Sequence, residues 1–106
     1  MIVSTTYELT GYVITKHLGV VRGVTVRSRS ALGNIGGAIQ SLFGGNLSIF
    51  TQLAEHARQE AYDLMVEHAQ QLGADAVVGM LYDANDIMDG ITEVLAYGTA
   101  VKIQRA

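Results

Sequence analysis

The sequence predicts one α+β domain in which a helix layer packs on a mainly antiparallel sheet. Three observations carry this prediction. Val, Thr, Tyr and Ile dominate residues 11–29, the strongest helical periodicity covers 48–72, and two apolar, strand-like segments follow it. With 106 residues, the chain fits a single domain spanning 1–106.

The first half of the chain is expected to supply two strands and a short helix. The run GYVITKHLGVVRGVTVRSR, residues 11–29, is typical of two strands joined near Arg22 and Gly23, with Gly19 marking a bulge or a close approach. In SALGNIGGAIQSLFGGN, residues 30–46, apolar side chains recur at helical spacing. The internal glycines predict a weak helix that packs closely against a neighbouring backbone.

The long helix predicted over 48–72 has one apolar and one polar face. The apolar face is predicted to contain Leu53, Ala57, Ala61, Leu64, Met65, His68 and Leu72. A lone histidine on such a face is usually packed and hydrogen-bonded, so His68 is expected to be structural and not a ligand. Gly73 supplies the left-handed residue that commonly ends a helix.

The stretch LGADAVVG, residues 72–79, is predicted to join that helix to a buried strand. Its near-continuous apolar run is typical of a strand covered on both faces. Asp75 stands at the strand entrance, where a carboxylate accepts backbone N–H bonds of the turn, and this role is favoured over catalysis. The polar turn YDANDIMDGI then predicts a hairpin, and Gly98 marks a bulge in the final strand.

Composition excludes several classes of function. The chain contains no Cys, which rules out disulfides, thiolate metal sites and cysteine nucleophiles. Its net charge of −3 gives no general attraction to nucleic acid or to an anionic membrane. No segment reaches the roughly 20 apolar residues that span a bilayer, and the N-terminus lacks the pattern of a signal peptide. A cytoplasmic location is therefore expected.

The surface is expected to be short of charge. Only 16% of the residues are charged, against about 25% in an average soluble domain. This deficit predicts that other subunits cover part of the apolar surface, so the protein is expected to form a homo-oligomer.

Several motifs together resemble the YbjQ-like family of uncharacterised bacterial and archaeal proteins. The motifs are LGADAVVG after an Ala- and Glu-rich helix, GTAVK at 98–102, STT at 4–6, GVVRG at 19–23 and GG at 44–45. The resemblance covers essentially the whole chain. It implies a β-α-β-β core like that of a dodecin subunit, a ring-forming pentamer and heavy-metal binding, and it brings no catalytic motif.

One stripe of the long helix is the best candidate for a metal site. His56, Glu60, Asp63 and Glu67 follow one another at spacings of four, three and four residues, along one helical line. An imidazole and carboxylates suit a divalent transition metal such as Zn, Mn, Ni or Fe(II). The alternative is a solvated acidic face, which is common on amphipathic helices and which the single sequence favours. Oligomerisation would favour the metal by bringing copies of the stripe together.

A second candidate site lies in the only basic concentration of the chain, which contains Arg22, Arg27 and Arg29. Arg27 and Arg29 project from the same face if their strand is regular. They can bind a phosphate, or they can pair with carboxylates of a neighbouring subunit. The expected oligomer favours the pairing.

The sequence predicts a non-enzymatic, oligomeric binding or scaffold protein with a divalent transition metal as its candidate cofactor. The alternative is a small-molecule or phosphate-ligand binder that uses Arg27 and Arg29 at subunit interfaces. An enzyme with an active site shared between subunits is a third candidate, and no motif supports it.

Overall fold

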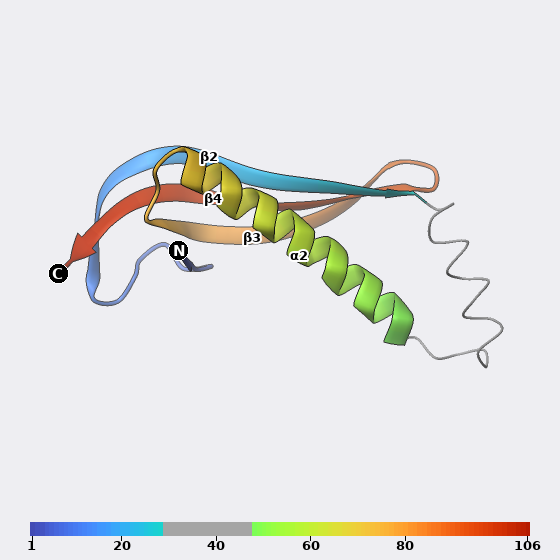
Figure 1. Cartoon of the computed structure of the whole chain (residues 1–106), viewed down its shortest axis with the longest axis horizontal. Coiled ribbons are helices and arrows are strands. Elements are labelled where there is room, and N and C mark those ends of the chain that lie inside the picture. The colour runs from blue at the N-terminus through green and yellow to red at the C-terminus, as the bar shows by residue number, and fades with distance from the viewer. Residues whose placement is uncertain (29–47) are drawn as a thin grey trace.

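The computed structural model describes residues 1–28 and 48–106, and it confirms the α+β fold. The described part forms a helix packed on a four-stranded mixed sheet (Figure 1). The elements are β1 (Ile2–Val3), β2 (Tyr12–Ser28), α2 (Ser48–Gln71), β3 (Ala76–Met88) and β4 (Ile91–Arg105). The strand order is β1-β3-β4-β2; β1 is parallel to β3 and the other pairs are antiparallel. The short helix predicted within 30–46 lies outside the described residues.

β2 is one long strand where the sequence predicted two. The predicted joint near Arg22 and Gly23 is wrong, because both residues continue the ladder with β4. Gly23 has a packing role instead. A Cβ atom at this position would collide with the backbone carbonyl of Ala61 and the backbone nitrogen of Met65, so the glycine allows α2 to approach the strand closely.

Bulges interrupt the ladders on both sides of β4. The register of β2 shifts next to Gly19, which has a φ of 116°, as the sequence predicted. The bulge predicted at Gly98 is wrong, because the extra residues lie in β3 around Gly79. Gly98 lies opposite, where a Cβ atom would come within 2.7 Å of Val77 Cγ1. Its small size therefore accommodates the bulged partner strand.

The joint predicted in LGADAVVG is confirmed. The helix ends at Gln71, and Gly73, with a φ of 76°, donates its N–H to the carbonyl of Gln70 at 2.9 Å. Asp75 accepts a backbone N–H as expected, but the donor is Ile103 of β4 at 3.0 Å and not a residue of the turn. The carboxylate therefore fixes the entrance of β3 against its partner strand.

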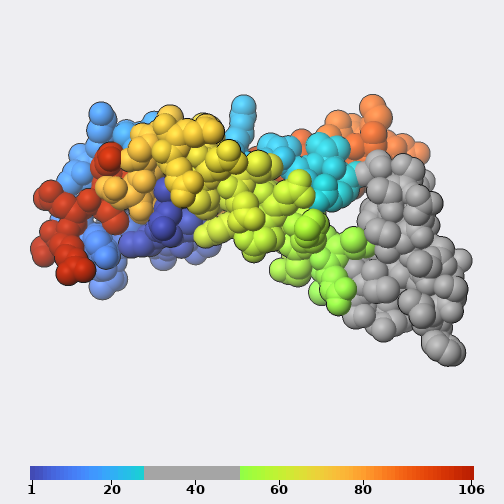
Figure 2. Space-filling view, viewed as in Figure 1, coloured from blue at the N-terminus to red at the C-terminus, as the bar shows by residue number. Residues whose placement is uncertain are grey.

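The hairpin between β3 and β4 is longer than the sequence predicted. Its turn is the Asp-Gly pair at 89–90. Residues 82–88, predicted as part of a polar turn, instead continue β3 opposite β4, and all of them are exposed. In the space-filling view the orange tip of this hairpin lies apart from α2 (Figure 2).

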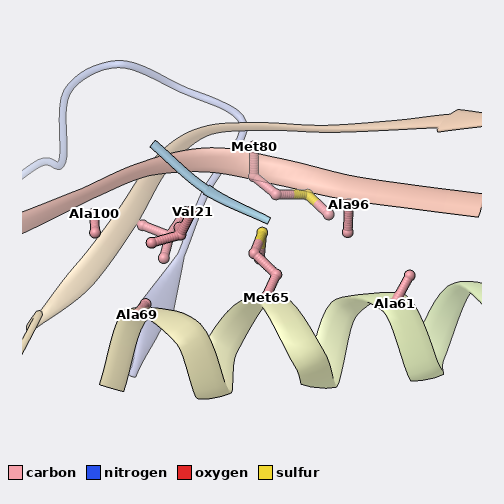
Figure 3. Packing of buried hydrophobic residues seen from close by; sticks show 8 residues of the cluster. Val21, Ala61, Met65, Ala69, Met80, Ala96 and Ala100 are labelled. Atoms are coloured by element: carbon pink, nitrogen blue, oxygen red, sulfur yellow. The ribbon is translucent and has the colours of Figure 1, made fainter. Parts of the chain in front are cut away.

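The main core lies between α2 and the sheet. Met65 is fully buried and points from the helix toward Val21 and Met80 (Figure 3). The buried stripe of the helix consists of Ala57, Ala61, Met65 and Ala69. Leu64 and Leu72, predicted on the buried face, are 39% and 42% exposed. Ala57, Ala61 and Met65 are buried as predicted, and the contact face is rotated away from Leu64 toward Ala69.

The opposite face of the sheet is covered at one end by the N-terminal segment. A second buried cluster lies there, formed by Ala76, Val78 and Val101 with Leu9, Ile14 and Ile103 packed against it. Backbone hydrogen bonds hold the segment in place: Ser4 donates to Val77 at 2.9 Å, and Thr6 accepts from Gly79 at 2.8 Å. The STT motif thus has a structural role beside the β3 bulge.

Candidate functional site

The stripe predicted as a metal site lies on the solvent side of α2. His56, Glu60, Asp63 and Glu67 line one shallow hollow of about 230 Å³ together with Gln59 and Leu64. The distance from His56 Nε2 to Glu60 Oε2 is 4.0 Å, and Asp63 accepts a hydrogen bond from Gln59 at 2.9 Å. The helix therefore places the four side chains on one surface, where they are open to solvent or to another chain.

The donors of one chain do not fit a heavy-metal site. Within the described residues, no three His, Cys, Asp or Glu side chains come close enough together to hold an ion. The segment 29–47, which lies outside them, contains none of these four residue types. The chain also lacks Cys, and soft heavy metals prefer thiolate ligands. The described residues of one chain therefore do not by themselves form a site with three or more such ligands.

Arg27 and Glu60, which belong to the two separate candidate sites, bind each other. The Arg27 guanidinium forms an ion pair with the Glu60 carboxylate and also donates to Thr25 Oγ1 at 3.0 Å. Thr25 is buried, so this pair joins the end of β2 to α2. From the sequence, the partner of Arg27 was expected to be either a phosphate or a carboxylate of a neighbouring subunit. In the structure it is a carboxylate of the same chain, that of Glu60. Arg29 lies outside the described residues.

The ion pair gives the protein a predicted dependence on pH. The hydrogen bond from Arg27 lowers the pKa of Glu60 below its ordinary value of 4.5, and partial desolvation opposes this shift. Because the pKa of Glu60 is lower in the folded state than in the unfolded state, the ionised carboxylate stabilises the fold. This stabilisation is complete above the unfolded-state pKa of 4.5 and is lost as the pH falls through the lower folded-state pKa. We expect Glu60→Gln to lower the thermal midpoint near pH 7. The difference from wild type should shrink below pH 4.5.

Glu67→Gln is the matched control for this experiment, since Glu67 lies on the same helix and forms no ion pair with a described residue. Its thermal midpoint should follow that of wild type at every pH. An equal loss in both variants would contradict a specific role for the Arg27–Glu60 pair.

His68 is a structural hydrogen-bond acceptor, as the sequence predicted. Its Nδ1 accepts the backbone N–H of Arg22 at 3.2 Å. Arg22 lies on β2, which is an edge strand and pairs with β4 alone among the described strands. The imidazole therefore satisfies a backbone donor that the sheet itself leaves unpaired.

A groove between α2 and the sheet is a feature that the sequence did not reveal. It has a volume of about 300 Å³ and is lined by apolar side chains of α2, β3 and β4 together with Arg27 and Arg58. Its residues come from β2, α2, β3 and β4, so no periodic pattern within one element could predict the groove.

Comparison with known proteins decides the family. A family model described as "Putative heavy-metal-binding" matches residues 1–104. The chain belongs to the YbjQ-like family. This confirms the assignment made from LGADAVVG and the accompanying motifs. A UPF0145 protein of Chromobacterium violaceum is 62% identical to this YbjQ-like chain over 102 residues, which cover 96% of the chain and 87% of that protein.

Further relatives support the same assignment. The UPF0145 proteins of Solibacter usitatus and Burkholderia thailandensis are 57% and 55% identical to this YbjQ-like chain. The alignments cover 95% and 99% of the chain, and 90% and 95% of the two relatives.

A solved structure resembles the YbjQ-like fold described above. It is a protein of unknown function from Pediococcus pentosaceus in the DUF74 family, with a TM-score of 0.64 over 98% of both chains and 18% identity. At this identity the likeness shows the fold alone. Separately, the described part of the chain contains no helix that is both long and apolar enough to cross a membrane.

Proposed function

We propose that this YbjQ-like protein is a non-enzymatic, homo-oligomeric binding protein whose subunits meet through the uncovered half of the sheet. One observation carries the proposal: the valines of β2 on the face turned away from α2 are bare. Val20, Val24 and Val26 are 70%, 40% and 50% exposed. They alternate with the buried Val21, Gly23 and Thr25, which face the helix.

The bare apolar face continues across the sheet. Val24 lies opposite Leu95 of β4, and Tyr97 lies opposite Leu81 of β3, which is also exposed. The described structure has a Cα radius of gyration of 17.3 Å, against about 13 Å for a compact domain of 100 residues. An extended subunit with a contiguous apolar face favours association with further copies, and the family resemblance leads us to expect five.

The double variant Val24→Lys/Val26→Lys tests the assembly. Two charges on the proposed interface have no partners there, so we expect the complex to dissociate at micromolar concentration. Native mass spectrometry gives the subunit number directly. Leu72→Lys, at the exposed end of α2, is the control and should keep the wild-type mass. A monomeric wild type, or a double variant with the wild-type subunit number, would overturn the proposal.

A divalent transition metal is the ligand we propose for the assembled protein. The family description and the stripe on α2 support it, and the single chain lacks the donors for a complete site. Side chains of a neighbouring subunit would supply the remaining ligands. His56 would bind the ion through its imidazole, and the nearby carboxylates would balance its charge.

Metal titration separates this role from a solvated acidic face. We expect His56→Ala to weaken binding of Zn²⁺ or Ni²⁺ at least about tenfold, since even outer-shell changes cost that much. Isothermal titration calorimetry measures the affinity, and His17→Ala on β2 is the matched control. An affinity that His56→Ala leaves unchanged would remove the stripe from consideration.

The second candidate function is binding of a small molecule or a phosphate-containing ligand. It is favoured by the position of Arg27 at the border of the groove between α2 and the sheet. Native mass spectrometry of untagged protein also distinguishes the two ligands, because a retained metal and a retained organic molecule add different masses.

A further inference from the structure

We propose that the groove beside Arg27 and Arg58 binds a small organic monoanion with an apolar body, such as an aromatic or branched aliphatic carboxylate or sulfonate. The proposal rests on the binding role above and names the ligand class for one site. It requires neither the metal nor a particular number of subunits.

The shape and lining of the groove favour an apolar ligand body. Its volume of about 300 Å³ lies at the lower end of the range for small-molecule pockets. Leu53 and Ala57 of α2 and Val94 of β4 line it, and Ala57 is almost fully buried. A ligand that covers these side chains removes apolar surface from water, which is the main source of affinity in such sites.

The charges around the groove favour an anionic head group. Arg27 and Arg58 line the groove, and no carboxylate does so among the described residues, although the chain as a whole carries a net charge of −3. Thr25 and Glu60 hold the Arg27 guanidinium in place, so little side-chain freedom is lost on binding. An arginine has five N–H donors, which leaves further donors for a ligand.

Arg58 is the more available of the two arginines. Its side chain is half-exposed, and its Nη1 lies 3.4 Å from the exposed carboxylate of Glu55. Such surface pairs contribute little and exchange readily with solvent. Arg58 is therefore free to turn toward a ligand. Glu60 already balances part of the charge of Arg27, so the site suits one negative charge better than the two of a phosphate.

A pair of fluorescent dyes tests the ligand class. Anilinonaphthalene sulfonate has an apolar aromatic body with one negative charge, and phenylnaphthylamine has the same rings without the sulfonate. We expect saturable binding of the sulfonate with one site per chain, weakened about tenfold by Arg58→Gln, since charge-assisted hydrogen bonds contribute that much. Arg105→Gln, at the far end of β4, is the matched control. Phenylnaphthylamine should bind the wild type and Arg58→Gln equally.

A second variant tests the location of the site. Ala54→Phe places an aromatic ring in the groove from an exposed helical position and should weaken sulfonate binding at least about tenfold. Gln70→Phe adds the same ring at the other end of α2 and should have no effect. Sulfonate binding that neither Arg58→Gln nor Ala54→Phe alters would overturn the proposal, because the dye would then occupy another apolar surface.

Light scattering on the same variants separates the groove from the subunit interface. The proposal expects Ala54→Phe to keep the wild-type subunit number while it loses the dye. A changed subunit number would make the groove a contact between chains and would overturn the ligand assignment. Dye binding that survives in the Val24→Lys/Val26→Lys variant would support the groove even if the proposed assembly proves wrong.

Discussion

Replacing Gly23 with alanine is expected to lower the free energy of unfolding by about 3 kcal/mol. The added Cβ atom would meet the backbone of Ala61 and Met65, and Leu64 Cβ would be only 2.8 Å away. Backbone atoms of a helix cannot rotate aside as a flexible side chain does. The helix would have to move off the sheet, and the contacts of the Ala57–Ala69 stripe would loosen together. Urea denaturation at a fixed protein concentration measures the change.

Gly11→Ala is the control for the general cost of removing a glycine. Gly11 has a φ of 85°, and a Cβ atom there meets nothing within 4 Å. The substitution should therefore cost only the strain of a left-handed backbone, about 1–2 kcal/mol. If Gly23→Ala proves no more costly than this control, the close approach of helix and strand is not what requires glycine at position 23.

Met65→Ala is expected to cost about 2–5 kcal/mol, through lost burial and a residual cavity. Met65 is the largest fully buried side chain of the main core and lies between Val21 and Met80. The alanines beside it are too small to fill the space it would leave. Leu64→Ala, one position away on the same helix and 39% exposed, should cost under about 1 kcal/mol. Equal losses in the two variants would contradict the assignment of the buried face.

Local signals in the sequence predicted the elements that depend on neighbouring residues. The helix Ser48–Gln71, the left-handed Gly73 after it and the strand that follows agree with the periodicity and the turn chemistry of the sequence. The Asp-Gly turn of the hairpin is a signal of the same kind. The resemblance to the family predicted the overall fold, because its motifs extend over the whole chain.

Features that depend on distant residues escaped prediction. The sequence predicts a joint at Gly23, because a glycine in a strand has the same local pattern whether the chain turns there or another backbone lies close. Helical spacing predicted the buried Ala57, Ala61 and Met65, but it also placed the exposed Leu64 on the buried face and omitted Ala69. The exact rotation of the face depends on how closely the sheet approaches the helix. Residues 82–88 include Asp83, Asn85 and Asp86 and were predicted as part of a polar turn, yet their backbone groups pair with β4 and hold them in a strand.

In the candidate site, too, the features set by neighbouring residues were predicted and those set by distant residues were not. Helical spacing placed His56, Glu60, Asp63 and Glu67 on one surface. It carried no information on the partner of Glu60, since Arg27 is 33 residues away in the sequence. The groove likewise combines residues of α2 with residues of the sheet. The metal site that we propose would need donors of a second chain, and no pattern within one chain predicts where these lie.

The hydrogen bond from Arg22 to His68 provides an internal reporter of helix docking. Its donor belongs to the outer edge of β2 and its acceptor belongs to α2, so exchange of this amide with solvent requires the helix to leave the strand. Neighbouring amides of β2 that bond to β4 exchange only when the sheet opens. Hydrogen exchange at these adjacent positions thus distinguishes undocking of the helix from unfolding of the sheet within a single strand.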